Sequence, residues 1–121
     1  MTGAPDAHEA LTTLAALCPC VVIKRGADGA IGAAGGHVSE APAEAAEVLD
    51  TTGAGDCFNA GFLVGWLGGL PLEHSLVLGN ICGARAVEAF GGYRGCPDAQ
   101  AFRLIAADRG IELPALEGKT A

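Results

Sequence analysis

The spacing of hydrophobic and polar residues predicts a helix and three short strands in the first third of the chain. Apolar residues recur at helical spacing along residues 6–17, which predicts an amphipathic helix. Residues 21–24 form a short β-branched run that predicts a buried strand. Residues 30–34 and 37–40 predict two further strands, and the Gly-Gly pair between them predicts a two-residue hairpin turn.

The rest of the chain is predicted to be mostly helical, after one segment with conflicting signals. The alanines and glutamates of residues 41–47 favour a helix, whereas Pro42 and the apolar residues 48–49 favour an extended path. We expect the extended path, with residues 48–49 ending a buried strand. Three helices are predicted over residues 58–67, 71–90 and 98–109, the last capped by Asp98. Because strands alternate with helices, the predicted fold class is α/β.

Length, composition and charge narrow the classes of protein. The 121 residues suffice for one small domain, and neither a repeat nor a linker divides them. Half of the residues are hydrophobic, which is typical of a chain that forms a core. The net charge of −7, without a basic patch, argues against a nucleic-acid partner. No apolar run has membrane-spanning length and no signal peptide opens the chain, so we expect no membrane partner and a cytoplasmic location.

Five cysteines and three histidines give no metal-binding pattern. The cysteine count is odd and no Cys-x-x-Cys pair occurs, so we expect five reduced thiols that pack as small hydrophobic residues. The histidines are scattered, without the spacing of metal ligands.

Residues 50–59, Asp-Thr-Thr-Gly-Ala-Gly-Asp-Cys-Phe-Asn, are the stretch with the clearest chemistry. They place a glycine-rich loop before a predicted helix, and helix N-termini bind anions through unpaired N–H groups and a positive dipole end. Gly53 and Gly55 have no Cβ, so a phosphate could approach the backbone. Asp56 would lie in the first helical turn. Taken singly, these features are ordinary: an Asp at a helix start is usually a cap, and Gly-Ala-Gly is a common turn.

Two better-known nucleotide motifs fit this stretch poorly. It half matches the dinucleotide-binding fingerprint, but Phe58 stands where the third glycine belongs. It is not a Walker phosphate loop, because no Gly-Lys-Ser/Thr follows. A Rossmann-type dinucleotide binder therefore ranks well below the next interpretation.

The complete string closely resembles the C-terminal signature of the ribokinase-like (PfkB-type) carbohydrate kinases, and the similarity runs over residues 21–108. The resemblance implies a Rossmann-like three-layer fold and ATP-dependent phosphorylation of a sugar or nucleoside hydroxyl. It implies that Asp56 is the general base and that the backbone of Gly53, Ala54 and Gly55 forms the anion hole. Phosphoryl transfer needs such positioning and charge stabilisation more than covalent chemistry.

The resemblance also implies residues for the nucleotide. Residues 22–30 resemble the strand and glycine turn beside the nucleotide phosphates, where Gly26 belongs to the turn and Lys24 could place a charge on a phosphate. A surface lysine at a strand end is the alternative for Lys24. Asn80 matches a polar position in the family's adenine and ribose pocket, and Gly83 would allow a ligand to approach closely. The alternative for Asn80 is a solvated or locally bonded amide.

The resemblance implies two metal ions. Mg²⁺ would arrive with ATP, held mainly by phosphates and water. Many members also bind a monovalent cation, usually K⁺, near the anion hole. The matching positions are Asp50, Thr52, Ala86, Ala89, Gly91 and Gly95. Gly95 lacks the side-chain oxygen that some relatives supply, and Asp50 could instead be a loop cap.

Family members run to about twice this length or more. Their N-terminal half carries central strands, the lid, most sugar-binding residues and an Asn-x-x-Glu motif, none of which this sequence contains. We therefore expect residues 1–121 to be the C-terminal nucleotide-binding and catalytic part of such a kinase, from a truncated or mis-started chain. By itself it should be inactive and self-associate through an exposed edge of a parallel sheet. A non-catalytic nucleotide-binding or interaction remnant is the alternative, and the sugar remains unidentified.

Overall fold

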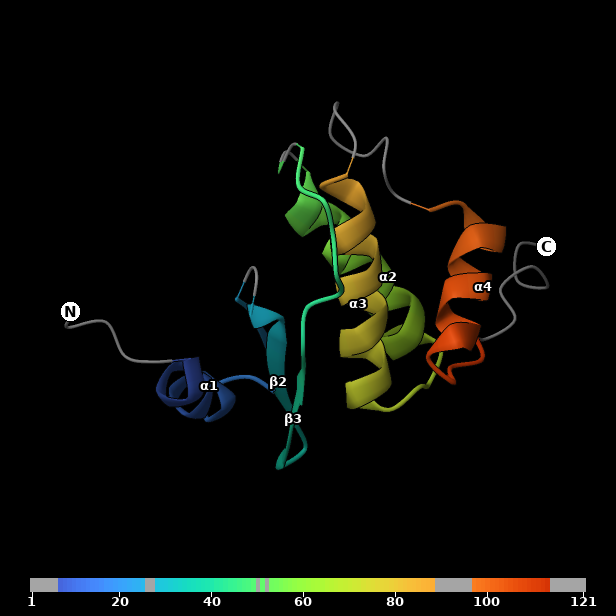
Figure 1. Ribbon diagram of the computed structural model, residues 1–121. Helices are drawn as coiled ribbons and strands as arrows, with labels where there is room; N and C mark the ends of the chain where they lie inside the picture. The colour runs from blue at the N-terminus through green and yellow to red at the C-terminus, as the bar shows by residue number, and fades with distance from the viewer. Residues whose placement is uncertain (1–6, 26–27, 50, 52, 89–96, 114–121) are drawn as a thin grey trace.

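A computed structural model describes residues 7–25, 28–49, 51, 53–88 and 97–113 of the chain. Four helices and three strands lie in these residues, and Figure 1 shows their arrangement: α1 (Ala7–Ala15), β1 (Cys20–Lys24), β2 (Ala30–Ala34), β3 (His37–Ala41), α2 (Ala54–Leu67), α3 (Leu72–Ala86) and α4 (Ala99–Asp108). Helix α1 covers one side of the sheet, α2 and α3 lie on the other side, and α4 packs beyond them. None of the described helices is long and apolar enough to cross a membrane.

The sheet is an antiparallel meander in the order β1-β2-β3. Strand β2 pairs with both neighbours, with Gly32 opposite Val22 on β1 and Ser39 on β3. Gly35 and Gly36 have φ angles of 57° and 82°, a left-handed conformation that glycine adopts without strain. The predicted hairpin is therefore confirmed. The predicted parallel sheet is not found among the described strands, all of which pair antiparallel.

Strand β2 is buried on both faces because helices cover both sides of the sheet. Ile31 and Ala33 pack with Leu11 of α1. Gly32 faces the opposite side, where an added Cβ would lie 3.2 Å from Leu72 Cδ1 of α3. The alternation along the strand thus builds two cores at once.

Helices α2 and α3 pack with their backbones unusually close because glycines form the interface. A Cβ on Gly61 of α2 would lie 2.5 Å from the backbone oxygen of Leu78. A Cβ on Gly79 of α3 would lie 2.8 Å from the ring of Phe58. The two glycines therefore leave room for a neighbouring backbone and a neighbouring ring, respectively. This packing brings the N-terminal turn of α2 against α3.

Several predicted element boundaries are corrected by the structure. Helix α2 begins at Ala54 rather than at residue 58, because the left-handed Gly53 (φ 78°) turns the chain directly into the helix. Residues 48–49 do not end a buried strand: Val48 and Leu49 are 62% and 53% exposed, and no described strand pairs with them. Helix α4 begins as predicted, since Asp98 accepts a hydrogen bond from Ala101 N at 2.8 Å.

The cysteines differ in part from the expectation of five reduced thiols. Cys57 is disulfide-bonded, whereas Cys18, Cys20 and Cys82 are free. Cys18 is exposed, and Cys82 is buried between α2 and α3. The sequence pattern carried no information on which thiols the fold brings together.

Residues 42–49, called the strap below, follow the predicted non-helical path along α3. Arg85 Nη2 of α3 donates a hydrogen bond to the backbone oxygen of Ala45 at 2.5 Å. Leu49 N donates to the backbone oxygen of Val87 at 2.7 Å. These bonds fix the course of the strap before the chain enters the glycine-rich loop.

Candidate functional site

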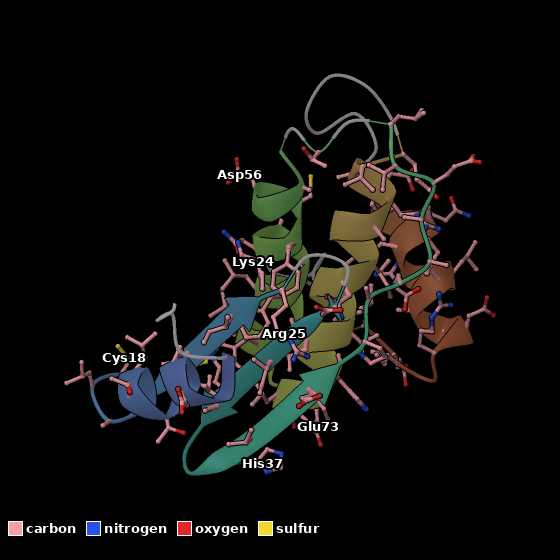
Figure 2. All side chains as sticks on the ribbon, turned by 60° about the vertical axis from the view of Figure 1, so that its left-hand side comes forward. Cys18, Lys24, Arg25, His37, Asp56 and Glu73 are labelled. Atoms are coloured by element: carbon pink, nitrogen blue, oxygen red, sulfur yellow. The ribbon has the colours of Figure 1, made fainter. Side chains whose placement is uncertain are left out.

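The N-terminus of α2 lacks a side-chain cap from its N-cap residue, and Ala54 N donates to the backbone oxygen of Thr51 at 3.2 Å. Gly53 is its N-cap and supplies no side-chain hydrogen bond to the first turn. The first N–H groups of a helix lack intrahelical partners, and together with the helix dipole they attract an anion. Asp56 lies in this first turn, as predicted, and its side chain is exposed (Figure 2).

A cavity of about 500 Å³ lies between the start of α2, helix α3, the strap and the end of β1. Its volume is in the range typical of small-molecule sites. Five residues that the sequence analysis assigned to the site line it: Lys24, Ala54, Gly55, Asn80 and Gly83. Gly53 and Asp56 are their neighbours on the loop and first turn. The structure therefore brings the predicted anion-hole and nucleotide residues together around one cavity.

Other predicted site residues cannot be placed. Gly26, Asp50, Thr52, Ala89, Gly91 and Gly95 lie outside the described residues. Ala86 is described, and its side chain is buried in the core beside α4. The described part of the chain contains no group of three or more His, Cys, Asp or Glu residues that could hold a metal. The K⁺ site, which would use mainly backbone oxygens, stays a prediction.

Lys24 ends β1 and points toward α2 (Figure 2). Its Nζ donates hydrogen bonds to Asn59 Oδ1 at 3.1 Å and to the backbone oxygen of Gly55 at 3.5 Å. The same Nζ lies 5.6 Å from the centroid of the Phe58 ring. Lys24 is thus held by specific partners beside the first turn of α2.

Asn80 is buried in α3 and uses its amide nitrogen to hold the strap. Nδ2 donates to the backbone oxygens of Ala41 at 3.2 Å and Pro42 at 2.9 Å. The side chain therefore lines the cavity and fixes its opposite wall at the same time. Neither a solvated amide nor a ligand contact alone describes this residue.

The strap supplies cavity residues that the sequence analysis missed. Four of its residues line the cavity: Ala43, Glu44, Ala46 and Val48. Glu44 Oε2 accepts a hydrogen bond from Arg109 Nε at 3.1 Å, and Oε1 contacts Arg109 Nη2. This bond to Glu44 is the main reason that the pKa of Arg109 is raised. Residues 43–48 show no regular alternation of polar and apolar residues, so no local sequence signal could have identified the lining residues.

The fold of the described residues is that of the carbohydrate kinases with a ribokinase fold. Residues 1–99 match the pfkB family carbohydrate kinase, so the chain belongs to that family. The predicted α/β ribokinase-like class is confirmed.

Among its relatives, a fructoselysine 6-kinase of Shigella flexneri is 34% identical over 75% of this chain and 37% of the relative. A probable sugar kinase of Rhizobium etli has a solved structure that superposes with a TM-score of 0.76 at 32% identity, over 90% of this chain and 32% of the other. A putative ribokinase II of Escherichia coli, solved with ATP and Mg²⁺, gives a TM-score of 0.76 at 25% identity, over 88% of this chain and 34% of the other. The chain spans about a third of the length of the curated relatives it matches.

Proposed function

We propose that this chain provides the nucleotide-binding and catalytic part of an ATP-dependent kinase that phosphorylates a sugar or nucleoside hydroxyl. The observation that carries the proposal is the N-terminus of α2, which has no side-chain cap and adjoins a cavity lined by Lys24 and Asn80. A helix N-terminus suits the phosphates, and the adjoining cavity has the size and apolar lining that suit a nucleoside. Family membership and the ATP- and Mg²⁺-bound relative support the same assignment.

The chemical roles follow from charge. Backbone N–H groups of Gly53, Ala54 and Gly55 would stabilise the negative charge of the transferring phosphoryl group, which is the main requirement of this reaction. Ala54 N would exchange its bond to the Thr51 oxygen for one to the phosphoryl group. Asp56 would accept the proton of the acceptor hydroxyl as its oxygen bonds to phosphorus and the leaving oxygen departs with the nucleoside diphosphate. Mg²⁺ bound to the phosphates would neutralise further charge.

Isothermal titration of the chain with ATP and with NAD tests the nucleotide assignment. We expect ATP to bind in the presence of Mg²⁺ and NAD to bind far more weakly, because Phe58 occupies the position of the third fingerprint glycine. Binding of NAD without any response to ATP would favour a dinucleotide-binding module instead.

Replacement of Asp56 by Asn tests the catalytic assignment in the active kinase that carries this sequence. Asn has nearly the same shape but cannot accept the hydroxyl proton, so turnover should fall about 10²–10⁴-fold. ATP affinity and melting temperature should change little, because Asp56 is exposed. Turnover within a few-fold of the parent would leave Asp56 only as an acidic residue of the first helical turn, and turnover that falls together with melting temperature would make its role structural.

The alternative is a non-catalytic nucleotide-binding module. ATP binding that is unaffected by Asp56→Asn, with no phosphoryl transfer to any sugar or nucleoside offered, would support the module over the kinase.

A further inference from the structure

We propose that Asn59 is a positioning residue for phosphate recognition: its amide oxygen holds the Lys24 ammonium beside the cavity, where the ammonium can bind the phosphate chain of the nucleotide. The proposal rests on the proposed function, because it refines how the same site recognises its nucleotide. Asn59 itself does not line the cavity, whereas Lys24 does.

The first step is the arrangement around Lys24. Its ammonium has three N–H donors, and the described residues supply two acceptors, Asn59 Oδ1 at 3.1 Å and the backbone oxygen of Gly55 at 3.5 Å. The bond to Gly55 is at the upper limit of hydrogen-bond length. One donor is therefore available to a ligand, and a second can be exchanged at little cost.

The second step is the position of Asn59 on α2. Gly55 and Asn59 are four residues apart, so they share one face of the helix. Phe58 lies between them in the sequence, and its ring faces the same ammonium. Asn59 and Phe58 thus hold Lys24 at a fixed distance from the anion-binding turn that Gly55 belongs to.

The third step is the chemistry of the acceptor. An amide oxygen orients an ammonium without cancelling its charge, whereas a carboxylate at the same position would neutralise it. The distinction matters in a chain with a net charge of −7, where phosphate binding depends on local positive groups. The neutral Asn59 leaves the full charge of Lys24 to a phosphate.

A purely structural role is the competing explanation, because the same bonds link β1 to α2. The two roles differ in what they affect. A structural link changes stability and the binding of every ligand alike, whereas a positioning role changes the binding only of ligands that carry phosphates.

Isothermal titration of the chain with ATP, inorganic tripolyphosphate and adenosine separates these roles. Lys24→Met should weaken ATP and tripolyphosphate binding about tenfold or more, the usual effect of losing a charge-assisted hydrogen bond. Asn59→Leu, which keeps the size and removes the acceptor, should weaken both about threefold or more. Adenosine binding and melting temperature should stay nearly constant in both variants. Gln100→Leu, which replaces an exposed amide on α4, is the matched control and should change none of the three affinities.

Two further variants make the test specific. In the Lys24→Met background, Asn59→Leu should have no additional effect, because its role is exerted through Lys24. Asn59→Asp should weaken tripolyphosphate binding more than Asn59→Leu, because it retains an acceptor but neutralises the ammonium.

Additive effects of the two substitutions, or an equal loss of adenosine binding, would overturn the inference while leaving the nucleotide site intact. A wild-type chain that binds none of the three ligands would overturn the proposed function, and the inference with it.

Discussion

At the scale of single residues, the hydrogen bonds of Asn80 connect the cavity wall to the strap. Replacing Asn80 by Ala removes both bonds from Nδ2 and leaves the backbone oxygens of Ala41 and Pro42 without this donor. We expect a loss of about 1–3 kcal/mol in the free energy of unfolding, measured by urea denaturation. ATP affinity should fall as well, because the strap forms one wall of the cavity.

Gln100→Ala is the control for this prediction, since it removes an exposed amide and should change stability by at most about 0.5 kcal/mol. Equal stabilities for the Asn80 and Gln100 variants would mean that the bonds to the strap contribute nothing in solution.

The positions of the site residues were predicted well where these residues are close together in the sequence. The glycine-rich loop and Asp56 could be placed at the start of a helix because they occupy consecutive positions, while their roles in catalysis stay predictions. The partners of Lys24 could not, because Asn59 is 35 residues away and only the packing of β1 near α2 brings the two together. The Glu44–Arg109 pair, 65 residues apart, escaped prediction for the same reason.

At the scale of elements, the contact between α2 and α3 depends on glycine. In Gly61→Ala, the new Cβ would lie 2.5 Å from Leu78 O and 2.9 Å from Cys82 Sγ, so the helices would have to separate. We expect a net destabilisation of about 1–3 kcal/mol, although alanine by itself favours a helix by about 1 kcal/mol. Thermal and urea unfolding measure the difference.

Gly83→Ala is the matched control on the partner helix. Its nearest neighbours would be 3.6 Å from the new Cβ, an ordinary contact, so the helix propensity should dominate and stability should rise slightly. The methyl group would enter the wall of the cavity, so ATP affinity should fall. A destabilised Gly83 variant together with a neutral Gly61 variant would contradict this account of the interface.

Some helices and strands could be predicted from local sequence patterns, whereas others could not. The hairpin and α4 follow from local signals, namely two adjacent glycines and an Asp cap. The start of α2 was missed by four residues because apolar periodicity begins at Phe58, whereas the helix begins where Gly53 adopts a positive φ. The strand expected at residues 48–49 was wrong because an apolar pair does not specify a pairing partner.

At the scale of the whole molecule, the free thiols of Cys18 and Cys82 should react with a reagent at different rates, because only one of them is exposed. Cys18 is exposed, whereas Cys82 is 6% exposed and burial raises the pKa of its thiol to about 11. A thiol reagent should therefore label Cys18 quickly and Cys82 only as fast as the core opens. Mass spectrometry of the peptides during labelling measures both rates, and equal rates would show that the core between α2 and α3 is open to solvent.

The raised pKa of the Cys82 thiol makes the stability of the fold depend on pH. Below the ordinary thiol value of 9.0, Cys82 is protonated in both states and its contribution to stability is complete. As the pH rises from there toward about 11, the unfolded thiol ionises while the buried one does not, so the free energy of unfolding falls. Cys82→Ala should show a smaller fall between pH 8 and pH 10 than the parent; identical falls would remove Cys82 as a cause.

We expect self-association through an apolar surface formed by α1 and the β2–β3 hairpin. Leu14, Leu17 and Val38 are 41%, 76% and 53% exposed, and no described strand pairs with the outer edge of β1. Exposed apolar patches and open strand edges both promote association. Sedimentation velocity should show association that increases with concentration and decreases in Leu17→Lys. Leu104→Lys, on the opposite side of the molecule, should not change it, and a monomer at every concentration would contradict the prediction.

The way the strap is held has a consequence for how such a site can diversify. Its main fastenings are hydrogen bonds from Asn80 and Arg85 to backbone oxygens, which every amino acid provides. Apart from the pair between Glu44 and Arg109, these bonds do not depend on the side chains of the strap. Positions 46 and 48, which line the cavity, are free to vary without displacing it. Substitutions at these two positions can change the shape of the cavity while the path of the strap stays the same. Natural variation or protein engineering can therefore alter which ligands fit without altering the fold.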